Sequence, residues 1–300
     1  MSKNNVNEET SLIKTIEVGD DTTGIIRIGE GLPLVFIGGP CAIESESHAL
    51  FMAEKMAEIC NKLNVPFIYK SCYNKDCRSS VNSFLGIGLD EGLAILEKVR
   101  REIGVPVTTD ISDADWAAPT GQVADLIQIP AYLCRQTHLL VSAGKTGKPI
   151  NIKKGQFMSP WNMKNSARKI EHIGNNQILL SERGTFFGYN MLVNDYRGLK
   201  IMQDSGYPVC YDATHSIQQP TSLGTISGGE REFIPSLVRA AAASGIQALF
   251  MEVHDNPDQA LSDPATQLDL KHVEKILAQA IAIHAFRAEL RDTWGDDDVD

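Results

Sequence analysis

The sequence lacks an apolar run long enough to cross a lipid bilayer, which takes roughly 20 residues. It also lacks a basic stripe. The formal net charge is -10 and the pI is near 5.2, which argues against nucleic acid and anionic membrane surfaces as partners. The polar, acidic opening, MSKNNVNEETS, is unlike a signal peptide. The six cysteines have no paired spacing, so we expect reduced thiols and a cytoplasmic protein.

No stretch of the sequence has the composition of an interdomain linker, so we expect a single domain. The 300 residues, 43% hydrophobic and 22% charged, suffice for one large core. We expect residues 1–12 to be disordered and residues 13–290 to form the domain, beginning with a β-hairpin at 13–28 around a turn at Gly19. The acidic residues 291–300 should form a frayed tail.

A repeated pattern fills the rest of the chain. A short apolar run, often opened by proline, is followed by a polar loop and a segment of helical period. The eight runs are Pro33–Ile37, Pro66–Lys70, Pro106–Asp110, Leu126–Ile129, Pro149–Lys153, Ile178–Ser181, Pro208–Asp212 and Ala248–Glu252. The helical segments include His48–Leu63, Leu89–Ile103, Ile234–Ser244 and Leu270–Ala285. Eight such strands alternating with helices predict a closed (β/α)8 TIM barrel. The alternative is an open doubly wound sheet, and the absence of a glycine-rich phosphate-binding motif after the first run weakens it.

Polar residues end nearly every apolar run. The clearest case is PVCYDATHSIQQP at 208–220, where strand composition stops at Asp212 and His215 follows. The other strand ends and their loops supply Lys70, Lys75, Asp110, Gln128, Lys153, Arg183 and Glu252. One such end is explained equally well by a strand capped with solvated residues. Because the carboxyl ends of all barrel strands face one mouth, their repetition favours a functional site.

Four cations should meet at this mouth, namely Lys70, Lys75, Lys153 and Arg183. Like charges repel unless they are compensated, so the cluster predicts a bound phosphate or carboxylate. Adjacent strand residues point to opposite faces, and Lys153 and Lys154 therefore cannot both point inward. We expect Lys154 to be a solvated surface residue.

A second set of residues at the same mouth consists of Cys41, His215, Glu252 and Asp263. A thiolate, an imidazole and two carboxylates suit a divalent ion such as Zn²⁺, Fe²⁺ or Mn²⁺. Since the four residues come from distant parts of the chain, their spacing does not establish a site. The alternative is a buried Cys41 with ordinary hydrogen bonds for the other three.

Several motifs together resemble 3-deoxy-D-manno-octulosonate 8-phosphate synthases and their relatives. They are GGPCAIES at 38–45, ADLIQIPAYLCRQT at 124–137, NIKKGQF at 151–157, ERGTFFGYN at 182–190, DATHSIQQP at 212–220, SGGEREFIP at 227–235, MEVHDNP at 251–257 and ALSDPATQL at 260–268. The resemblance implies a (β/α)8 barrel, assembled as a homotetramer. It also implies a transferase that condenses phosphoenolpyruvate with arabinose 5-phosphate and water in lipopolysaccharide sugar biosynthesis.

The resemblance assigns roles to single residues. Phosphoenolpyruvate would be held by Lys70, Lys75, Lys153 and Arg183, with Asp110 and Gln128 lining the site. The aldose phosphate would be clamped by Arg78 and Ser79, and Arg135 matches an arginine lent across a subunit interface. Cysteine in the first-strand motif marks metal-dependent members, so the implied ligands of a divalent ion (Zn, Fe or Mn) are Cys41, His215, Glu252 and Asp263. The candidate catalytic residues are Lys75, His215 and Asp263.

The chain departs from the family pattern on the aldose side. Where the family usually has Lys-Ala-Asn-Arg-Ser, this chain has Asp76 and Cys77 at the second and third positions. Leu85 replaces a usual arginine and Ser112 a usual histidine. We therefore predict intact binding of phosphoenolpyruvate with an altered aldose preference. Two alternatives are a sister synthase acting on another aldose phosphate and a degenerate paralogue that binds ligand without chemistry.

Overall fold

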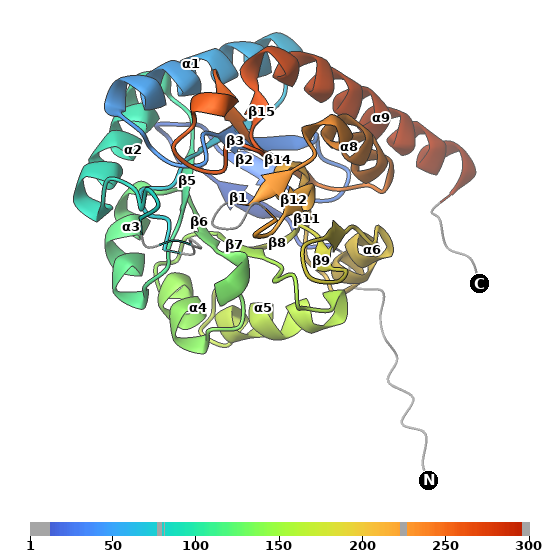
Figure 1. The fold of residues 1–300 in the computed structure, drawn as a ribbon. Coiled ribbons are helices and arrows are strands. Elements are labelled where there is room, and N and C mark those ends of the chain that lie inside the picture. The colour runs from blue at the N-terminus through green and yellow to red at the C-terminus, as the bar shows by residue number, and fades with distance from the viewer. Residues whose placement is uncertain (1–12, 77–79, 81, 223–226, 296–300) are drawn as a thin grey trace.

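The computed structural model describes residues 13–76, 80, 82–222 and 227–295. Figure 1 shows a closed barrel of strands in the centre of the molecule. Parallel strands follow the order β11-β8-β7-β6-β5-β4-β3-β14, and β11 pairs with β14 to close the ring. Their bounds are β3 (Val35–Gly39), β4 (Phe67–Lys70), β5 (Val107–Asp110), β6 (Leu126–Ile129), β7 (Ile150–Lys153), β8 (Ile178–Glu182), β11 (Val209–Asp212) and β14 (Ala248–His254). Each strand overlaps one predicted apolar run, and the (β/α)8 prediction is confirmed.

Helices surround the barrel on the outside (Figure 1). They are α1 (Glu46–Leu63), α2 (Leu89–Ile103), α3 (Ala117–Val123), α4 (Thr137–Gly144), α5 (Met163–Glu171), α6 (Arg197–Asp204), α7 (Ala213–Ser216), α8 (Ile234–Ala243) and α9 (Val273–Trp294). Helix α9 runs past the expected end of the domain at residue 290. Residues 1–12 and the last part of the expected tail lie outside the described residues. None of the described helices is long and apolar enough to span a membrane.

The predicted N-terminal hairpin is present and closes one end of the barrel. It consists of the antiparallel strands β1 (Ile16–Val18) and β2 (Ile26–Ile28). The side chains of Ile16, Val18 and Ile28 are fully buried and pack in one cluster with interior residues near the amino ends of the barrel strands. The opposite end, where the strands finish, is left for polar side chains.

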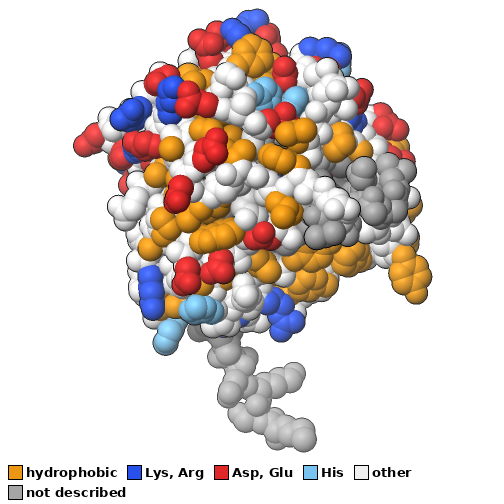
Figure 2. Space-filling view, turned by 60° about the vertical axis from the view of Figure 1, so that its left-hand side comes forward, with side chains coloured by type: hydrophobic (Ala, Val, Ile, Leu, Met, Phe, Trp, Pro, Cys, Tyr) orange, Lys and Arg blue, Asp and Glu red, His pale blue; other side chains and the backbone are white. Residues whose placement is uncertain are grey.

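Alternation along the barrel strands separates two environments. In β7, Ile150 and Ile152 pack outward against the helices, so Asn151 and Lys153 project into the barrel. Short strand pairings lie at the carboxyl end of the barrel. They are β9 (Thr185–Phe186) with β10 (Leu192–Val193), β12 (Gln218–Gln219) with β13 (Gly228–Gly229), and β15 (Leu268–Asp269) with the end of β14. On the outer face that Figure 2 shows, acidic and basic side chains are interspersed among hydrophobic ones.

Candidate active site

A chain of hydrogen bonds crosses the barrel interior above its apolar layer. Gln128 donates through Nε2 to Asp110 and accepts through Oε1 from Asn151 Nδ2 at 2.8 Å. Ser181 Oγ donates to Asn151 Oδ1 at 2.6 Å. Burial alone raises the pKa of Asp110, but nearby lysines outweigh it, so the pKa is lowered. The network therefore presents an ionised carboxylate beside the mouth, and its two members Asn151 and Ser181 were not among the predicted site residues.

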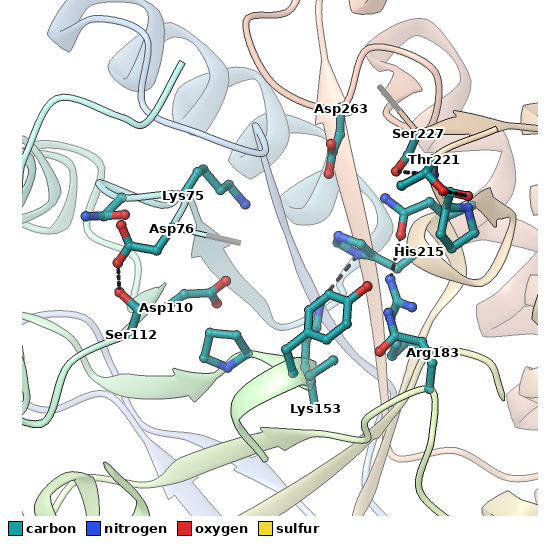
Figure 3. Close-up of a pocket in the computed structure, with 17 residues that line it drawn as sticks. Lys75, Asp76, Asp110, Ser112, Lys153, Arg183, His215, Thr221, Ser227 and Asp263 are labelled. Atoms are coloured by element: carbon teal, nitrogen blue, oxygen red, sulfur yellow. Dashed lines mark hydrogen bonds between the residues drawn. The ribbon is translucent and has the colours of Figure 1, made fainter. Parts of the chain in front are cut away.

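A pocket opens above this network, and Figure 3 shows the side chains that line it. Six predicted site residues are among the lining residues: Lys75, Asp110, Lys153, Arg183, His215 and Asp263. They come from different strand ends, as expected for a barrel mouth. Lys70 and Gln128 lie deeper, buried in the barrel.

Asp212 organises one wall of the pocket, although it was not among the predicted site residues. Its Oδ1 caps α7 by accepting the N–H of His215 at 2.9 Å, and its Oδ2 lies 2.7 Å from His215 Nδ1. Lys153 Nζ also donates to Oδ2. Burial raises the pKa of Asp212, but His215 and Lys153 outweigh that effect and lower it. The ionised Asp212 holds a proton on His215 Nδ1 and leaves Nε2 facing Glu252.

Glu252 compensates the lysines of the opposite wall. Its Oε1 accepts from Lys70 Nζ at 2.5 Å and lies 3.7 Å from Lys75 Nζ. Burial raises the pKa of Glu252, yet Lys70, His215 and Lys75 together hold it well below the usual range. Its Oε2 is buried without a hydrogen bond to any described residue and lies 3.7 Å from His215 Nε2. The three lysines of the predicted cluster are thus each paired with a carboxylate, which removes most of the repulsion that we expected.

Arg183 is the exception among the four predicted cations. Its side chain is buried, Nη2 donates to Gln218 Oε1 at 2.9 Å, and Nη1 has no hydrogen-bond partner in the described part of the chain. Burial lowers the pKa of Arg183 despite the opposing effect of Asp212. A buried guanidinium that forms no ion pair with a described residue calls for an anion in the pocket.

Three of the four predicted metal ligands come together. Cys41, Glu252 and Asp263 each offer a ligand atom, and these atoms lie within 4.8 Å of one another. The sulfur of Cys41 is 3.7 Å from Asp263 Oδ2. His215 stands outside this group, but its Nε2 approaches Glu252 as described. Thiolate, imidazole and carboxylate donors suit a borderline divalent ion, and the buried, unsatisfied Glu252 Oε2 fits such a ligand set.

Lys154 is buried, so the expectation of a solvated surface residue is wrong. Its Nζ lies 3.3 Å from Glu182 Oε1 and donates to Thr185 Oγ1 at 2.9 Å. The alternation argument itself holds, because Lys153 points into the pocket and Lys154 points away from it. Lys154 directly follows β7 and is enclosed there, because the end of β8 and the segment after it supply the carboxylate of Glu182 and the carbonyl of Gly184 as partners.

The predicted aldose side is only partly described. Arg78 and Ser79, with the altered Cys77, lie outside the described residues. Two other altered positions are in contact, since Ser112 Oγ donates to Asp76 Oδ2, and both line the pocket. Arg135 is exposed, and its carbonyl oxygen accepts from Lys169 Nζ at 2.7 Å. Its expected role across a subunit interface stays a prediction.

The fold and the pocket define the class of protein. A closed (β/α)8 barrel gathers buried lysines, carboxylates, an arginine and a histidine at the carboxyl ends of its strands, which is where barrel enzymes place their active sites.

Comparison with known proteins gives the family. The sequence matches the DAHP synthetase I family over residues 9–285, and this chain belongs to that family. It is 50% identical over 281 residues to a 2-dehydro-3-deoxyphosphooctonate aldolase of Synechococcus sp., covering 94% of this chain and 97% of the relative. A protein with the same name from Cyanothece sp. is 52% identical, covering 86% of this chain and 94% of the relative. Another from Desulfatibacillum aliphaticivorans is 47% identical, covering 91% of this chain and 98% of the relative. The family resemblance drawn from the motifs is confirmed.

Proposed function

We propose that this protein condenses phosphoenolpyruvate with arabinose 5-phosphate and water, giving 3-deoxy-D-manno-octulosonate 8-phosphate and inorganic phosphate. Family membership and the name shared by its relatives support this reaction. The observation that carries it is Arg183, a buried guanidinium in the pocket that lacks an ion pair with any described residue. Phosphoenolpyruvate bears a phosphate and a carboxylate, and either would satisfy that charge.

In the proposed complex the cations divide the anionic groups between them. Arg183 and Lys153 stand on the same side of the pocket (Figure 3) and would hold one anion together. Lys153 now donates to Asp212, so an arriving anion would share its Nζ rather than meet an unpaired charge. Because Lys70 is buried between Glu252 and the carbonyl of Cys41, its part is to hold Glu252 in place.

The reaction forms a bond between the third carbon of phosphoenolpyruvate and the aldehyde carbon, while water adds to the second carbon and phosphate leaves. The aldehyde oxygen gains a proton, and Lys75, on one side of the pocket, is the group placed to donate it. The water loses a proton, and His215, on the other side of the pocket, is the group placed to take it through Nε2. Asp263 on the same side would orient the water. Substitution of Lys75, or of His215 or Asp263, should reduce the rate of turnover more than the affinity for phosphoenolpyruvate.

A divalent ion would be held by Cys41, Glu252 and Asp263, whose ligand atoms lie together. His215 would be the fourth ligand only while its Nε2 is not taking a proton. When bound, such an ion polarises an oxygen of the aldehyde or the water and lowers the pKa of that water. Burial and the charge of Glu252 raise the pKa of the Cys41 thiol, so the ion is also what would deprotonate it. Zn²⁺, Fe²⁺ and Mn²⁺ all accept this ligand set.

We further propose that the enzyme is a cytoplasmic homotetramer. The five described cysteines are free and buried, which suits a reducing compartment. An exposed Arg135 is free to reach a neighbouring subunit, as the family pattern implies.

The test is phosphate release from phosphoenolpyruvate in the presence of single aldose phosphates, each with and without a chelator. We expect release that depends on arabinose 5-phosphate and falls after metal removal. Release only with another aldose phosphate, such as erythrose 4-phosphate, would favour the sister synthase. Binding of phosphoenolpyruvate without release from any pair would identify a ligand-binding paralogue and overturn the proposal.

A further inference from the structure

A second group of metal-ligating side chains lies outside the residues that line the pocket. Glu44, His48 and His254 each offer one ligand atom, and these atoms lie within 4.8 Å of one another. They come from the β3–α1 loop, the first turn of α1 and the last residue of β14. We propose that they bind a second divalent cation of the class that takes imidazole and carboxylate ligands, such as Zn²⁺.

The spacing between His254 and Glu44 is that of two ligands on one ion. His254 Nε2 lies 3.3 Å from Glu44 Oε1, and the His254 side chain is only 5% exposed. Two ligands bound to tetrahedral zinc at about 2.0–2.1 Å lie about 3.3–3.4 Å apart. The contact is not a hydrogen bond, and Nε2 has no hydrogen-bond partner among the described residues. A buried imidazole nitrogen that lies 3.3 Å from a carboxylate oxygen and bonds no described residue leaves room for an ion that binds both groups.

One carboxylate lies within 3.0 Å of both histidines and bonds His48. Asp255 Oδ1 lies 3.0 Å from His48 Nε2 and 3.0 Å from His254 Nδ1. If each ring donates its proton to Asp255, the lone pairs remain on His48 Nδ1 and His254 Nε2. Those two nitrogens are the ones buried without a hydrogen bond in the described ranges. A carboxylate behind each ligating histidine is the usual arrangement of protein metal sites, because it fixes the tautomer and the ring orientation.

A bound ion would change which ring nitrogen of His254 carries the proton. The N–H of Asn256 also approaches His254 Nδ1, at 2.9 Å, and bonds it when the proton sits on Nε2. A cation on Nε2 selects the other tautomer, in which Nδ1 donates to Asp255. Metal binding would thus exchange the hydrogen bond from Asn256 to His254 for one from His254 to Asp255, and the N–H of Asn256 would have to turn away from the ring.

The proposed ion would fasten the two loops that carry Cys41 and Asp263. Glu44 follows Cys41 in the same loop, and Glu44 Oε1 accepts the N–H of Leu261 at 2.8 Å, two residues before Asp263. An ion joining Glu44 to His254 on β14 would hold both loops against a rigid strand. Its role is therefore structural, and its loss should loosen the loops without removing a pocket residue.

The experiment counts cations in chelator-stripped protein titrated with Co²⁺, followed by absorption spectroscopy and elemental analysis. Wild type should bind two ions per chain, and only the one at Cys41 should give a thiolate charge-transfer band. His48→Ala should bind one ion and keep the band, whereas Cys41→Ala should bind one ion without it. Asp255→Asn should weaken the second ion about 10–100-fold. His138→Ala, an exposed histidine elsewhere, is the matched control and should bind two.

Two results would overturn the proposal: Cys41→Ala that binds no ion, or His48→Ala that still binds two. Absence of the thiolate band from wild type would instead contradict the metal ligands given under the proposed function, because the ion that depends on His48 is counted separately. Circular dichroism confirms that each variant is folded, and Asp255→Asn supplies an independent measurement because its side chain is 40% exposed and the change keeps its size.

Discussion

Replacement of Arg183 by methionine should stabilise the protein and weaken its binding of phosphoenolpyruvate at the same time. The guanidinium is 3% exposed, burial lowers its pKa, and it has no ion pair with a described residue. A buried charge without a partner costs free energy that a methionine of similar length does not cost. We expect a gain on the order of 1 kcal/mol, or a rise of about 2 °C in the unfolding midpoint of the ligand-free protein.

The same change removes at least one charge-assisted hydrogen bond to the substrate. Such a bond contributes about 1.5–3 kcal/mol, so the dissociation constant of phosphoenolpyruvate should rise about 10- to 150-fold. Isothermal titration calorimetry measures the affinity, and thermal unfolding without ligand measures the stability. The opposite signs of the two effects distinguish a binding residue from a structural one.

Lys154→Met is the matched comparison because it also replaces a buried cation. Lys154 has a partner, and its loss leaves Glu182 buried and uncompensated, which should destabilise the fold by about 3–5 kcal/mol. Arg197→Met, at an exposed position whose ion-pair partner in the described part of the chain is Asp195, should change stability by no more than about 0.5 kcal/mol. If Arg183→Met destabilises the ligand-free protein and leaves the affinity unchanged, the assignment of Arg183 to the substrate is refuted.

Three further changes test other parts of the site. Cys41→Ala should lower the bound metal content far more than the unfolding midpoint, as elemental analysis and thermal unfolding would show. Cys77→Asn, which restores the amide usual in the family, should raise kcat/KM for arabinose 5-phosphate relative to other aldose phosphates. Gly39→Ala should destabilise the protein by about 2 kcal/mol or more, because the new Cβ would lie 2.0 Å from the carbonyl oxygen of Lys70. Urea unfolding measures that loss.

Each of these has an outcome that contradicts it. Equal, stoichiometric metal in wild type and Cys41→Ala would exclude the thiol as a ligand. A wild type that already strongly prefers arabinose 5-phosphate, with no change in Cys77→Asn, would end the idea of altered specificity. The control for Gly39 is Gly198→Ala in α6, where the nearest atom would be 3.5 Å away and the helix should tolerate the methyl group. If both glycine variants lose the same free energy of unfolding, the structure around Gly39 accommodates the new Cβ and the predicted clash is wrong.

The repeating architecture was predictable because it depends on local patterns. Each barrel strand is an apolar run buried on both faces, and α2 has the predicted bounds because its apolar residues keep one helical period. The two-residue pairings β9–β10 and β12–β13 are too short to show any period, so they were missed. The location of the site was predictable for a related reason, since strand ends in a barrel always converge.

Partnerships between side chains were not predictable in the same way. The sequence placed Lys154 on the outward face of β7 but did not reveal that Glu182, on the neighbouring strand, would meet it there. Asp212 marked a strand end, and its contact with His215 is local because it caps the helix three residues before that histidine, but its bond to Lys153 follows from the three-dimensional closure of the barrel. The group of Glu44, His48 and His254 brings together residues that lie about 200 positions apart, and no spacing rule indicates such a site.

The hairpin at the amino ends of the strands has a consequence for traffic through the enzyme. Since the fully buried side chains of Ile16, Val18 and Ile28 close that end, the described barrel opens to solvent at its carboxyl end and does not form a channel through the protein. Both substrates enter and both products leave along the same path. Whichever molecule sits outermost controls the escape of the one beneath it, and a compound lodged at the rim would therefore slow exchange of every reactant without touching the chemistry.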